Sequence, residues 1–429
     1  MSKKLHLVRK PLVKARRRRA GPLRLEALEE RYVLDVRSIT GFGNNIANPT
    51  EGMGNTDLLR VSPVAYADGI SAPSTPNTLS PRLISNNLNN QSSAIFQFTN
   101  DLGNPNSQRL SDYAYAFGQF IDHDMDLTLD NSGTAFNIPA DTRTFTLPDG
   151  TKVTDPMGVE PFTRSQFDPK TGMSKSNPRQ QINLDTSFLD LSQVYGSTDA
   201  VSSILRTHSG GQLRSSPGGF LPRESDFTAA ELATLNHDEG GIANDAQQVP
   251  DSQLFVAGDK RVNENVELTS QQTLFMRNHN RLAAQLQANH PGWTDEQLFQ
   301  EARKINIAEY QNIVFNGYVP SIIGTNGLAA YSGYKPGVDA AISTEFSTVG
   351  FRFGHTLLSN GVGRLNNDGT PITDVNPNGS TVNLAIDFFR PDLLNNNHVT
   401  VNLLDRFGNT DPHTSSTVGE VLKALADGL

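Results

Sequence analysis

The stretch of sequence that decides the fold is FGQFIDHDMD, residues 117–126. Its apolar side chains recur at helical spacing, which predicts a buried helix. Residues three and four positions apart share a helix face, so Gln119, Asp122 and His123 should point the same way, whereas Asp124 lies about 100° further round. Buried polar side chains cost free energy unless they are paired. We therefore expect the chemistry of the protein to lie on this face.

The composition is that of a large protein without cysteine. The chain has 429 residues, of which 36% are hydrophobic, enough for a sizeable core. The absence of cysteine excludes disulfides, thiolate metal sites and cysteine nucleophiles. No apolar run approaches the ~18 residues that a membrane-spanning helix needs.

Charge is unevenly spread along the chain. Residues 1–24 hold ten Lys or Arg and no acidic residue, whereas the remaining residues hold all 45 acidic groups and 26 of the 36 basic ones. The acidic remainder argues against a nucleic-acid partner. The start lacks the apolar stretch of an ordinary signal peptide. Its segment LRLEALEER, residues 23–31, is similar to a sorting motif of exported bacterial proteins, with an ordinary amphipathic helix as the alternative. We expect residues 1–36 to be a basic, disordered leader of a secreted or cell-surface protein.

Residues 37–429 are expected to form one mostly α domain with long ordered loops and little β-structure. Residues 38–110 are rich in Asn, Pro, Ser and Gly, which predicts an extended arm. A small hairpin is expected at residues 145–153 and a helix near residues 340–360. A final helix begins at Glu420 and is cut off by the end of the chain.

Two long helices are expected in the second half of the chain, at about residues 269–289 and 294–316. Each begins with the Thr-x-x-Gln pattern of a capping box, formed by Thr269 and Gln272 and by Thr294 and Gln297. The second helix should end at Gly317 and Pro320.

His123 is the natural proton carrier of the first helix. A lone histidine on a helix is more often a satisfied core residue than a catalyst. Gln119 and Asp122 on the same face favour catalysis, because imidazole exchanges protons near neutral pH.

A candidate metal site lies in the sequence TSFLDLS, which begins at Thr186. In an extended or curled loop, Thr186, Asp190 and Ser192 project to one side, with the carbonyl of Phe188 between them. With Asp124 they form a set of oxygen ligands, which suits Ca²⁺ better than Zn²⁺. The alternative is a strand with polar alternation.

Two further stretches carry candidate groups. In AGDKRVNE, residues 257–264, Arg261 and Glu264 are either a solvated ion pair or a cation placed where negative charge develops. In FRFGHT, residues 351–356, His355 is either a core histidine or the ligand of a large planar cofactor.

Together these stretches resemble the animal-type haem peroxidases of the peroxidase–cyclooxygenase superfamily. The resemblance covers most of residues 38–429, and the motifs follow the family's order, which makes them specific as a set. The matching segments are residues 43–45, 117–126, 186–197, 257–264, 277–282 and 351–357. The resemblance implies a bacterial member with an animal haem-peroxidase-like helical fold whose C-terminal part is missing.

The resemblance also implies a catalytic set. His123 would be the distal histidine that moves a proton between the two peroxide oxygens. Arg261 would stabilise negative charge on the leaving oxygen, and Gln119 would orient a water or a halide. The implied function is a peroxidase of the oxidative-stress response that reduces hydrogen peroxide through an oxoferryl intermediate and oxidises halide, pseudohalide or phenolic donors.

The resemblance assigns the remaining residues to cofactors. Haem b would be held by His355 at the iron, by Arg352 at a propionate and by ester bonds to Asp122 and Glu264. Calcium would be held by Asp124, Thr186, Phe188, Asp190 and Ser192, and would fix the distal helix.

One departure from the family concerns Asn265, which stands where its most oxidising members carry a methionine bonded to haem. That link is expected to be absent. Two alternative functions stay open: a fatty-acid dioxygenase of the same superfamily, and a catalytically inactive surface protein on a truncated peroxidase scaffold.

Overall fold

The computed structural model describes residues 38–74, 110–130, 135–139, 144–146, 152–154, 159–160, 162–238, 240–358, 361–366, 368, 370, 372, 382–383, 387–395, 400–404, 410–414 and 417–427. All of them belong to a unit that spans Arg37–Leu429. No helix among them is both long and apolar enough to cross a membrane. The leader and the whole segment from residue 75 to residue 109 lie outside the described residues.

The described unit is mostly helical, as predicted. Its α-helices are α2 (Tyr113–Met125), α3 (Ser192–Tyr195), α4 (Asp199–Ile204), α5 (Ala229–Asp238), α6 (Val266–Asn289), α7 (Asp295–Ile313), α8 (Val319–Ile323) and α10 (Val418–Asp427). Two segments are π-helical, η4 (Val314–Tyr318) and η5 (Phe346–Gly350). Four are 3₁₀-helical: η2 (Glu224–Asp226), η3 (Asp251–Gln253), η6 (Phe351–Leu357) and η7 (Pro391–Leu393).

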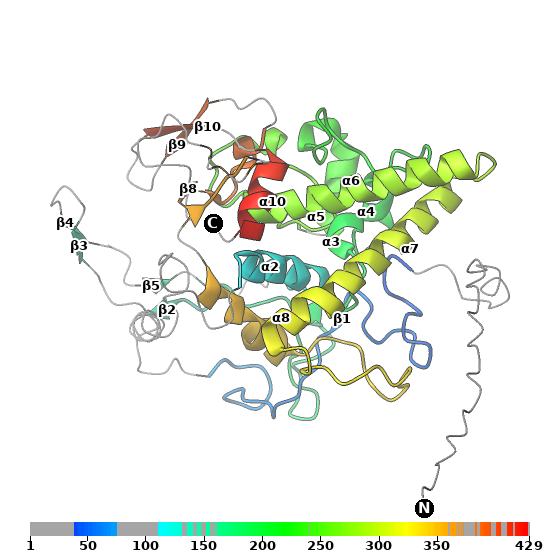
Figure 1. Cartoon of the computed structure of the whole chain (residues 1–429). Coiled ribbons are helices and arrows are strands. Elements are labelled where there is room, and N and C mark those ends of the chain that lie inside the picture. Colours follow the sequence, from blue (N-terminus) through cyan, green and yellow to red (C-terminus); the bar gives the residue numbers. More distant parts are fainter. Residues whose placement is uncertain are drawn as a thin grey trace, which may run out of the picture. The chain divides into compact units, whose positions relative to one another are not determined.

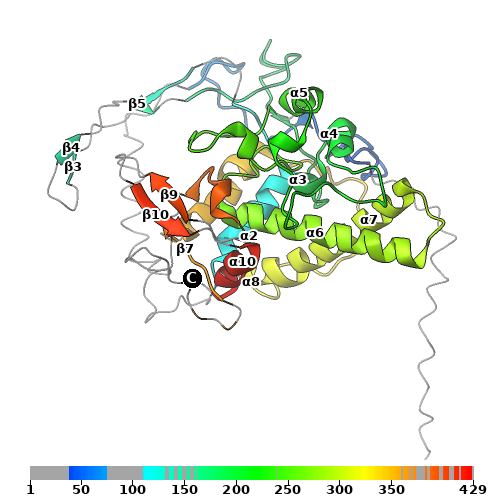
Figure 2. The same cartoon turned by 90° about the horizontal axis from the view of Figure 1, so that it is seen from above.

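The strands are short and pair two by two. They are β1 (Thr56–Asp57), β2 (Ile138–Pro139), β3 (Thr144–Thr146), β4 (Lys152–Thr154), β5 (Val159–Glu160), β6 (Ile182–Asn183), β7 (Gly361–Val362), β8 (Val382–Asn383), β9 (Thr400–Leu404) and β10 (Thr410–Thr414). All pairs are antiparallel: β1 with β6, β2 with β5, β3 with β4, β7 with β8 and β9 with β10. The β3–β4 pair confirms the predicted hairpin. In Figure 2 the β9–β10 pair lies outside the group formed by α2, α6 and α7.

The helices α6 and α7 form a hairpin, and α2 packs at its open end (Figure 1). The predicted cap of α6 is wrong by four residues. The cap is Asn265, whose side chain accepts a hydrogen bond from the backbone of Leu268, and Thr269 lies inside the helix. There its hydroxyl donates to the carbonyl of Val262. The capping box predicted for α7 is confirmed at Thr294.

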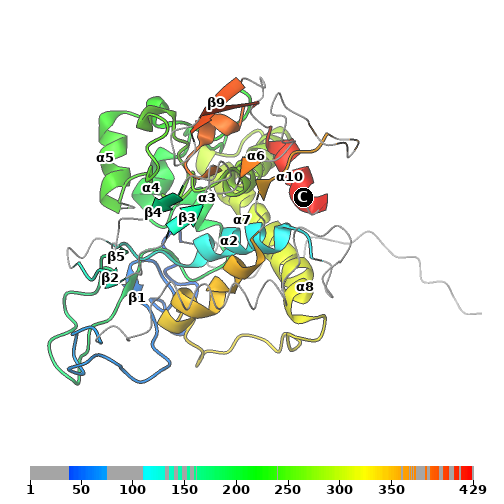
Figure 3. The same cartoon turned by 90° about the vertical axis from the view of Figure 1, so that its left-hand side faces the viewer.

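The predicted end of α7 is also wrong. The chain does not leave the helix at Gly317 but continues through η4 into α8. Pro320 lies at the start of α8, where its missing N–H costs little. The expected helix near residues 340–360 consists of η5 followed by η6. Figure 3 shows α2 between α6 and the orange helical segment that holds η5 and η6.

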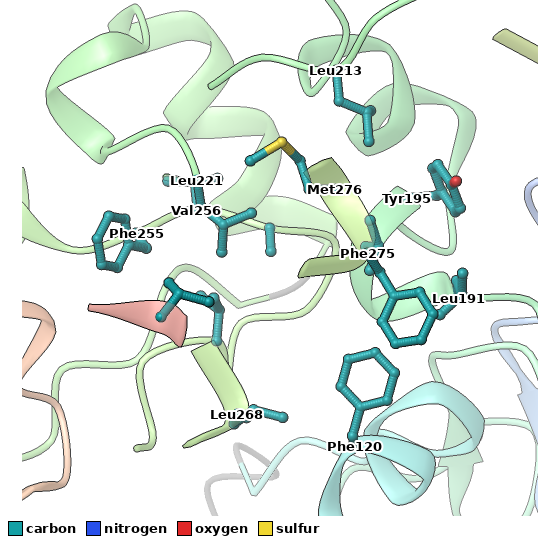
Figure 4. Close-up of a cluster of buried hydrophobic side chains, with 14 of the residues drawn as sticks. Phe120, Leu191, Tyr195, Leu213, Leu221, Phe255, Val256, Leu268, Phe275 and Met276 are labelled. Carbon is teal, nitrogen blue, oxygen red and sulfur yellow. The ribbon is translucent and has the colours of Figure 1, made fainter. Parts of the chain in front are cut away.

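An aromatic cluster fixes α2 against α6 and α7. Phe120 of α2 stacks on Phe275 of α6 with ring centroids 5.1 Å apart. Figure 4 shows these two side chains next to each other. Both rings meet the edge of Tyr310 from α7, at 5.7 Å and 5.6 Å. Such ring pairs contribute about 0.5–1.5 kcal/mol each beyond their buried area. The apolar face of α2 is thereby buried, and its polar face is held in a defined direction.

Candidate active site

A cavity of about 400 Å³ lies where α2, the start of α6 and η6 meet. Protein ligand pockets range from about 300 to 1,000 Å³. The cavity brings together side chains from three distant parts of the chain. Its walls contain every predicted catalytic and haem-binding residue: Gln119, Asp122, His123, Arg261, Glu264, Arg352 and His355.

His123 is enclosed in the cavity wall. It is 3% exposed, and its Nε2 lies 3.7 Å from Oε2 of Glu264, beyond hydrogen-bond range. Its Nδ1 has no hydrogen-bond partner among the described residues. Burial, reinforced by the positive charge of Arg261, lowers the pKa of His123 well below its usual value. The imidazole is therefore neutral at neutral pH and able to accept a proton.

The amide of Gln119 is held from two sides. Its Nε2 donates to Oε2 of Glu264 at 2.7 Å, and its Oε1 accepts from Nδ2 of Asn265 at 2.9 Å. Because Asn265 is also the cap of α6, the start of that helix sets the orientation of Gln119. Burial is the main cause that raises the pKa of Glu264.

Arg261 is fixed by Asp259, which is absent from the predicted site. Nε of Arg261 donates to Oδ1 of Asp259 at 2.9 Å, and Nη2 donates to Oδ2 at 2.5 Å. Nη2 also donates to the carbonyl of Asp126 at 2.8 Å and lies 3.5 Å from Asp185. Burial lowers the pKa of Arg261, but Asp259 more than offsets this and leaves the pKa well above its usual value. The guanidinium of Arg261 is therefore a fixed positive charge. In the sequence, the only indication of this contact is that an acid, Asp259, stands two positions before Arg261.

An ion pair joins α2 to η6 at the cavity. Nη1 of Arg352 lies 3.2 Å from Oδ2 of Asp122. Burial and repulsion from Asp126 raise the pKa of Asp122 to about 7, and Arg352 opposes this shift. His355, on the same segment as Arg352, is more exposed than His123. Burial and then Arg352 lower the pKa of His355, which keeps its imidazole neutral and able to bind a metal.

Two buried acids near the cavity are also absent from the predicted site. Glu267 lines the cavity, and its Oε1 accepts a hydrogen bond from the hydroxyl of Tyr115 at 2.7 Å. Burial, and then the charge of Asp387, raise the pKa of Glu267 to about 8. Burial raises the pKa of Asp387 to about 7. An acid in the first turn of a helix is usually an exposed residue that complements the helix dipole. The position of Glu267 in the sequence therefore does not indicate that its side chain is buried.

A second group of polar residues surrounds Asp124, which does not line the cavity. Oγ of Ser192 donates to the carbonyl of Asp124 at 2.9 Å and to its Oδ1 at 3.3 Å. The backbone of Asp190 donates to the carbonyl of Phe188 at 2.9 Å. Burial and then repulsion from Asp190 raise the pKa of Asp124 well above its usual value. In the described part of the chain, Oδ2 of Asp124 and Oγ1 of Thr186 are buried without a hydrogen-bond partner.

The described ranges contain no cluster of three or more His, Asp or Glu side chains arranged for a metal. A cation beside Asp124 would therefore depend on hydroxyl and carbonyl oxygens as well as on carboxylates. Ca²⁺ accepts such mixed oxygen ligands.

Comparisons with known proteins agree on one family. A model of the animal haem peroxidase family matches residues 36–420. Mouse myeloperoxidase is 35% identical over 364 residues, which cover 80% of this chain and 49% of the relative. Human thyroid peroxidase is 34% identical over 367 residues, which cover 77% of this chain and 38% of the relative. The chain thus spans less than half the length of either relative.

Solved structures share the fold. Peroxidase A from Dictyostelium discoideum matches with a TM-score of 0.66 at 27% identity, over 83% of this chain and 65% of that chain. A fatty acid alpha-dioxygenase from Arabidopsis thaliana matches with a TM-score of 0.54 at 17% identity, over 92% and 62%. The second likeness shows the fold alone.

Proposed function

The chain belongs to the animal haem peroxidase family, and from this premise we propose that it is a haem-dependent peroxidase that reduces hydrogen peroxide and oxidises halides, thiocyanate or phenols. One observation carries the proposal. A buried neutral His123, a fixed Arg261 and a second histidine, His355, line one cavity of ligand-binding size.

The residues of this cavity fit a haem group. Nδ1 of His123 is buried without a partner in the described ranges, and the neutral imidazole of His355 suits an iron ligand. His355 would ligate the iron and Arg352 would pair with a propionate. Asp122 and Glu264 would form ester bonds to two haem methyl groups, and each bond would require a two-electron oxidation of the methyl group, with hydrogen peroxide as the oxidant. The chemistry that haem supplies when bound is the reduction of peroxide at its iron.

The protein's own groups would handle protons and charge. His123 would take a proton from one peroxide oxygen at Nε2, the nitrogen nearer Glu264, and return it to the departing oxygen. Arg261, held by Asp259, would stabilise negative charge on that oxygen. Gln119 would hold a water or a halide beside His123.

Calcium binding beside Asp124 is a second part of the proposal. Two buried carboxylates, Asp124 and Asp190, repel each other, and Oγ1 of Thr186 is buried without a partner in the described ranges. A bound Ca²⁺ would relieve both costs. Because Asp124 directly follows His123, the cation would also stabilise the position of the distal helix.

The paired acids at the cavity, Asp122 and Glu264, favour a peroxidase over a dioxygenase. Export to the cell surface remains part of the proposal on the strength of the leader motif at residues 23–31.

Haem titration of the full chain tests the assignment of the iron ligand. Wild-type protein should develop a Soret band with one equivalent of haemin, and His355→Ala should lose that band or shift it. His290→Ala removes an exposed histidine in the turn between α6 and α7 and serves as the matched control. An unchanged Soret band in His355→Ala would refute the assignment.

A further inference from the structure

A tyrosine and a buried acid form a pair in the wall of the cavity that contains His123. Tyr115 lies on α2 and Glu267 on the first turn of α6, and both line the cavity. The two residues are 4% and 1% exposed. The hydroxyl of Tyr115 donates to Oε1 of Glu267 at 2.7 Å, and Oε2 of Glu267 has no hydrogen-bond partner in the described ranges. Neither residue takes part in the proton and charge transfers assigned above to His123 and Arg261.

Of the described tyrosines, Tyr115 and Tyr318 line this cavity, and their hydroxyl groups have different partners. The hydroxyl of Tyr318 donates to the backbone carbonyl of Ala114 at 3.0 Å, and a backbone carbonyl is not a base at neutral pH. A phenol that loses an electron becomes a strong acid, and a positive charge in a buried site is costly unless the proton leaves. Loss of an electron from Tyr115 is therefore eased by the carboxyl group of Glu267, whereas the carbonyl beside Tyr318 cannot take up the proton.

The charge state of Glu267 decides whether it can take this proton. Burial first, and then the charge of Asp387, raise the pKa of Glu267 to about 8; the hydrogen bond from Tyr115 opposes this shift, and Asp112 adds to it. The carboxyl group is thus mostly neutral near pH 7 and ionised above about pH 8. Because the ionised form is the better proton acceptor, transfer from Tyr115 should become easier as pH rises through this range.

We propose that Tyr115 is a one-electron donor to peroxide-oxidised haem and that Glu267 takes up its proton, an inference that rests on the peroxidase function proposed above. The phenol O–H bond breaks, the electron reduces the oxidised haem by one equivalent, the proton passes to Oε1 of Glu267, and a neutral phenoxyl radical remains on Tyr115. Hydrogen peroxide, which accepts two electrons and two protons to give two water molecules, is the oxidant. A phenol that enters the cavity then returns a hydrogen atom to the radical, and Glu267 releases its proton to the cavity.

Electron paramagnetic resonance of the haem-loaded full chain, frozen after addition of one equivalent of hydrogen peroxide, tests the proposal. Wild-type protein should give a phenoxyl signal that Tyr115→Phe loses. Tyr318→Phe changes the other described tyrosine of the cavity, serves as the matched control and should retain the signal. A signal that survives in Tyr115→Phe, or that is absent from wild type while its Soret band responds to peroxide, overturns this proposal alone. A wild-type Soret band that does not respond to peroxide overturns the peroxidase function as well.

The pH dependence of the phenoxyl signal tests the role of Glu267. In wild type the signal should grow between about pH 7 and about pH 9. Glu267→Gln cannot take up a proton but can keep the hydrogen bond from Tyr115, so its signal should be weak and independent of pH. Asp387→Asn removes a charge that raises the pKa of Glu267, so its signal should grow at lower pH than in wild type. A wild-type signal that is equal at both ends of the range, or an unchanged profile in Asp387→Asn, overturns the role of Glu267, and this comparison decides even if Tyr115→Phe does not retain haem.

Discussion

The buried carboxyl group of Glu267 should contribute to the dependence of the protein's stability on pH, and Glu267→Gln should remove that contribution. Burial and the neighbouring charge of Asp387 raise the pKa of Glu267 from 4.5 to about 8 in the folded protein. The unfolded chain releases this proton near pH 4.5, whereas the folded protein keeps it until about pH 8. Between these values the unfolded state is favoured progressively, so the contribution of Glu267 to stability falls as pH rises and becomes constant above pH 8.

The size of the effect follows from the two pKa values of Glu267. Their difference, at about 1.36 kcal/mol per pH unit, corresponds to an upper limit of about 5 kcal/mol. Glutamine cannot ionise, and its amide oxygen can still accept the hydrogen bond from Tyr115. Glu267→Gln should therefore gain several kcal/mol relative to wild type between pH 5 and pH 8.

Urea unfolding at one-unit steps from pH 5 to pH 9 measures this difference directly. The control is Glu309→Gln, which changes an exposed glutamate on α7 and should follow the wild-type curve. If the free energies of unfolding of wild type and Glu267→Gln stay parallel across this range, the carboxyl group is not held neutral by burial, and the reasoning fails.

Three further changes have defined outcomes. Gly118→Ala places a Cβ 2.6 Å from the hydroxyl oxygen of Tyr318. Although alanine favours helices, this clash should lower the free energy of unfolding in urea by about 1–3 kcal/mol. A variant more stable than wild type would contradict the contact. Asn265→Ala removes the cap of α6 and the hydrogen-bond partner of Gln119, and should cost about 0.5–2 kcal/mol in the same assay. Asn265→Ser can still cap the helix and should retain most of the stability. An equal loss in both variants would count against the cap. Added Ca²⁺ should raise the melting temperature of wild type but not of Asp124→Asn in calorimetry; equal shifts would exclude this site.

Local spacing was enough to predict the polar face of α2. The positions of Gln119, Asp122 and His123 follow from 3.6 residues per turn, and all three line one cavity. Spacing alone does not predict that Glu264 meets Gln119, because that contact joins residues 145 positions apart. The resemblance to a family supplied that grouping.

The errors have physical causes. Thr269 and Gln272 have the pattern of a capping box, but Asn265 can also cap a helix and is further held by Gln119 across the fold. Pro320 normally ends a helix, yet the π-helical segment before it lets the chain begin a new helix at Val319. Asp259 belongs to no sequence motif that would mark it as a site residue. Its role comes from its burial against Arg261, which only the fold reveals.

The most direct test of the proposed function is peroxide-dependent oxidation of guaiacol by haem-loaded His123→Ala beside wild-type protein. The variant keeps His355 and should therefore keep the Soret band. Loss of a positioned general base typically lowers a rate by about 10²–10⁴-fold, so we expect a fall of that size in the rate of guaiacol oxidation. Guaiacol oxidation by His123→Ala at the wild-type rate, with the Soret band intact, would contradict the role of this cavity as a peroxidase site.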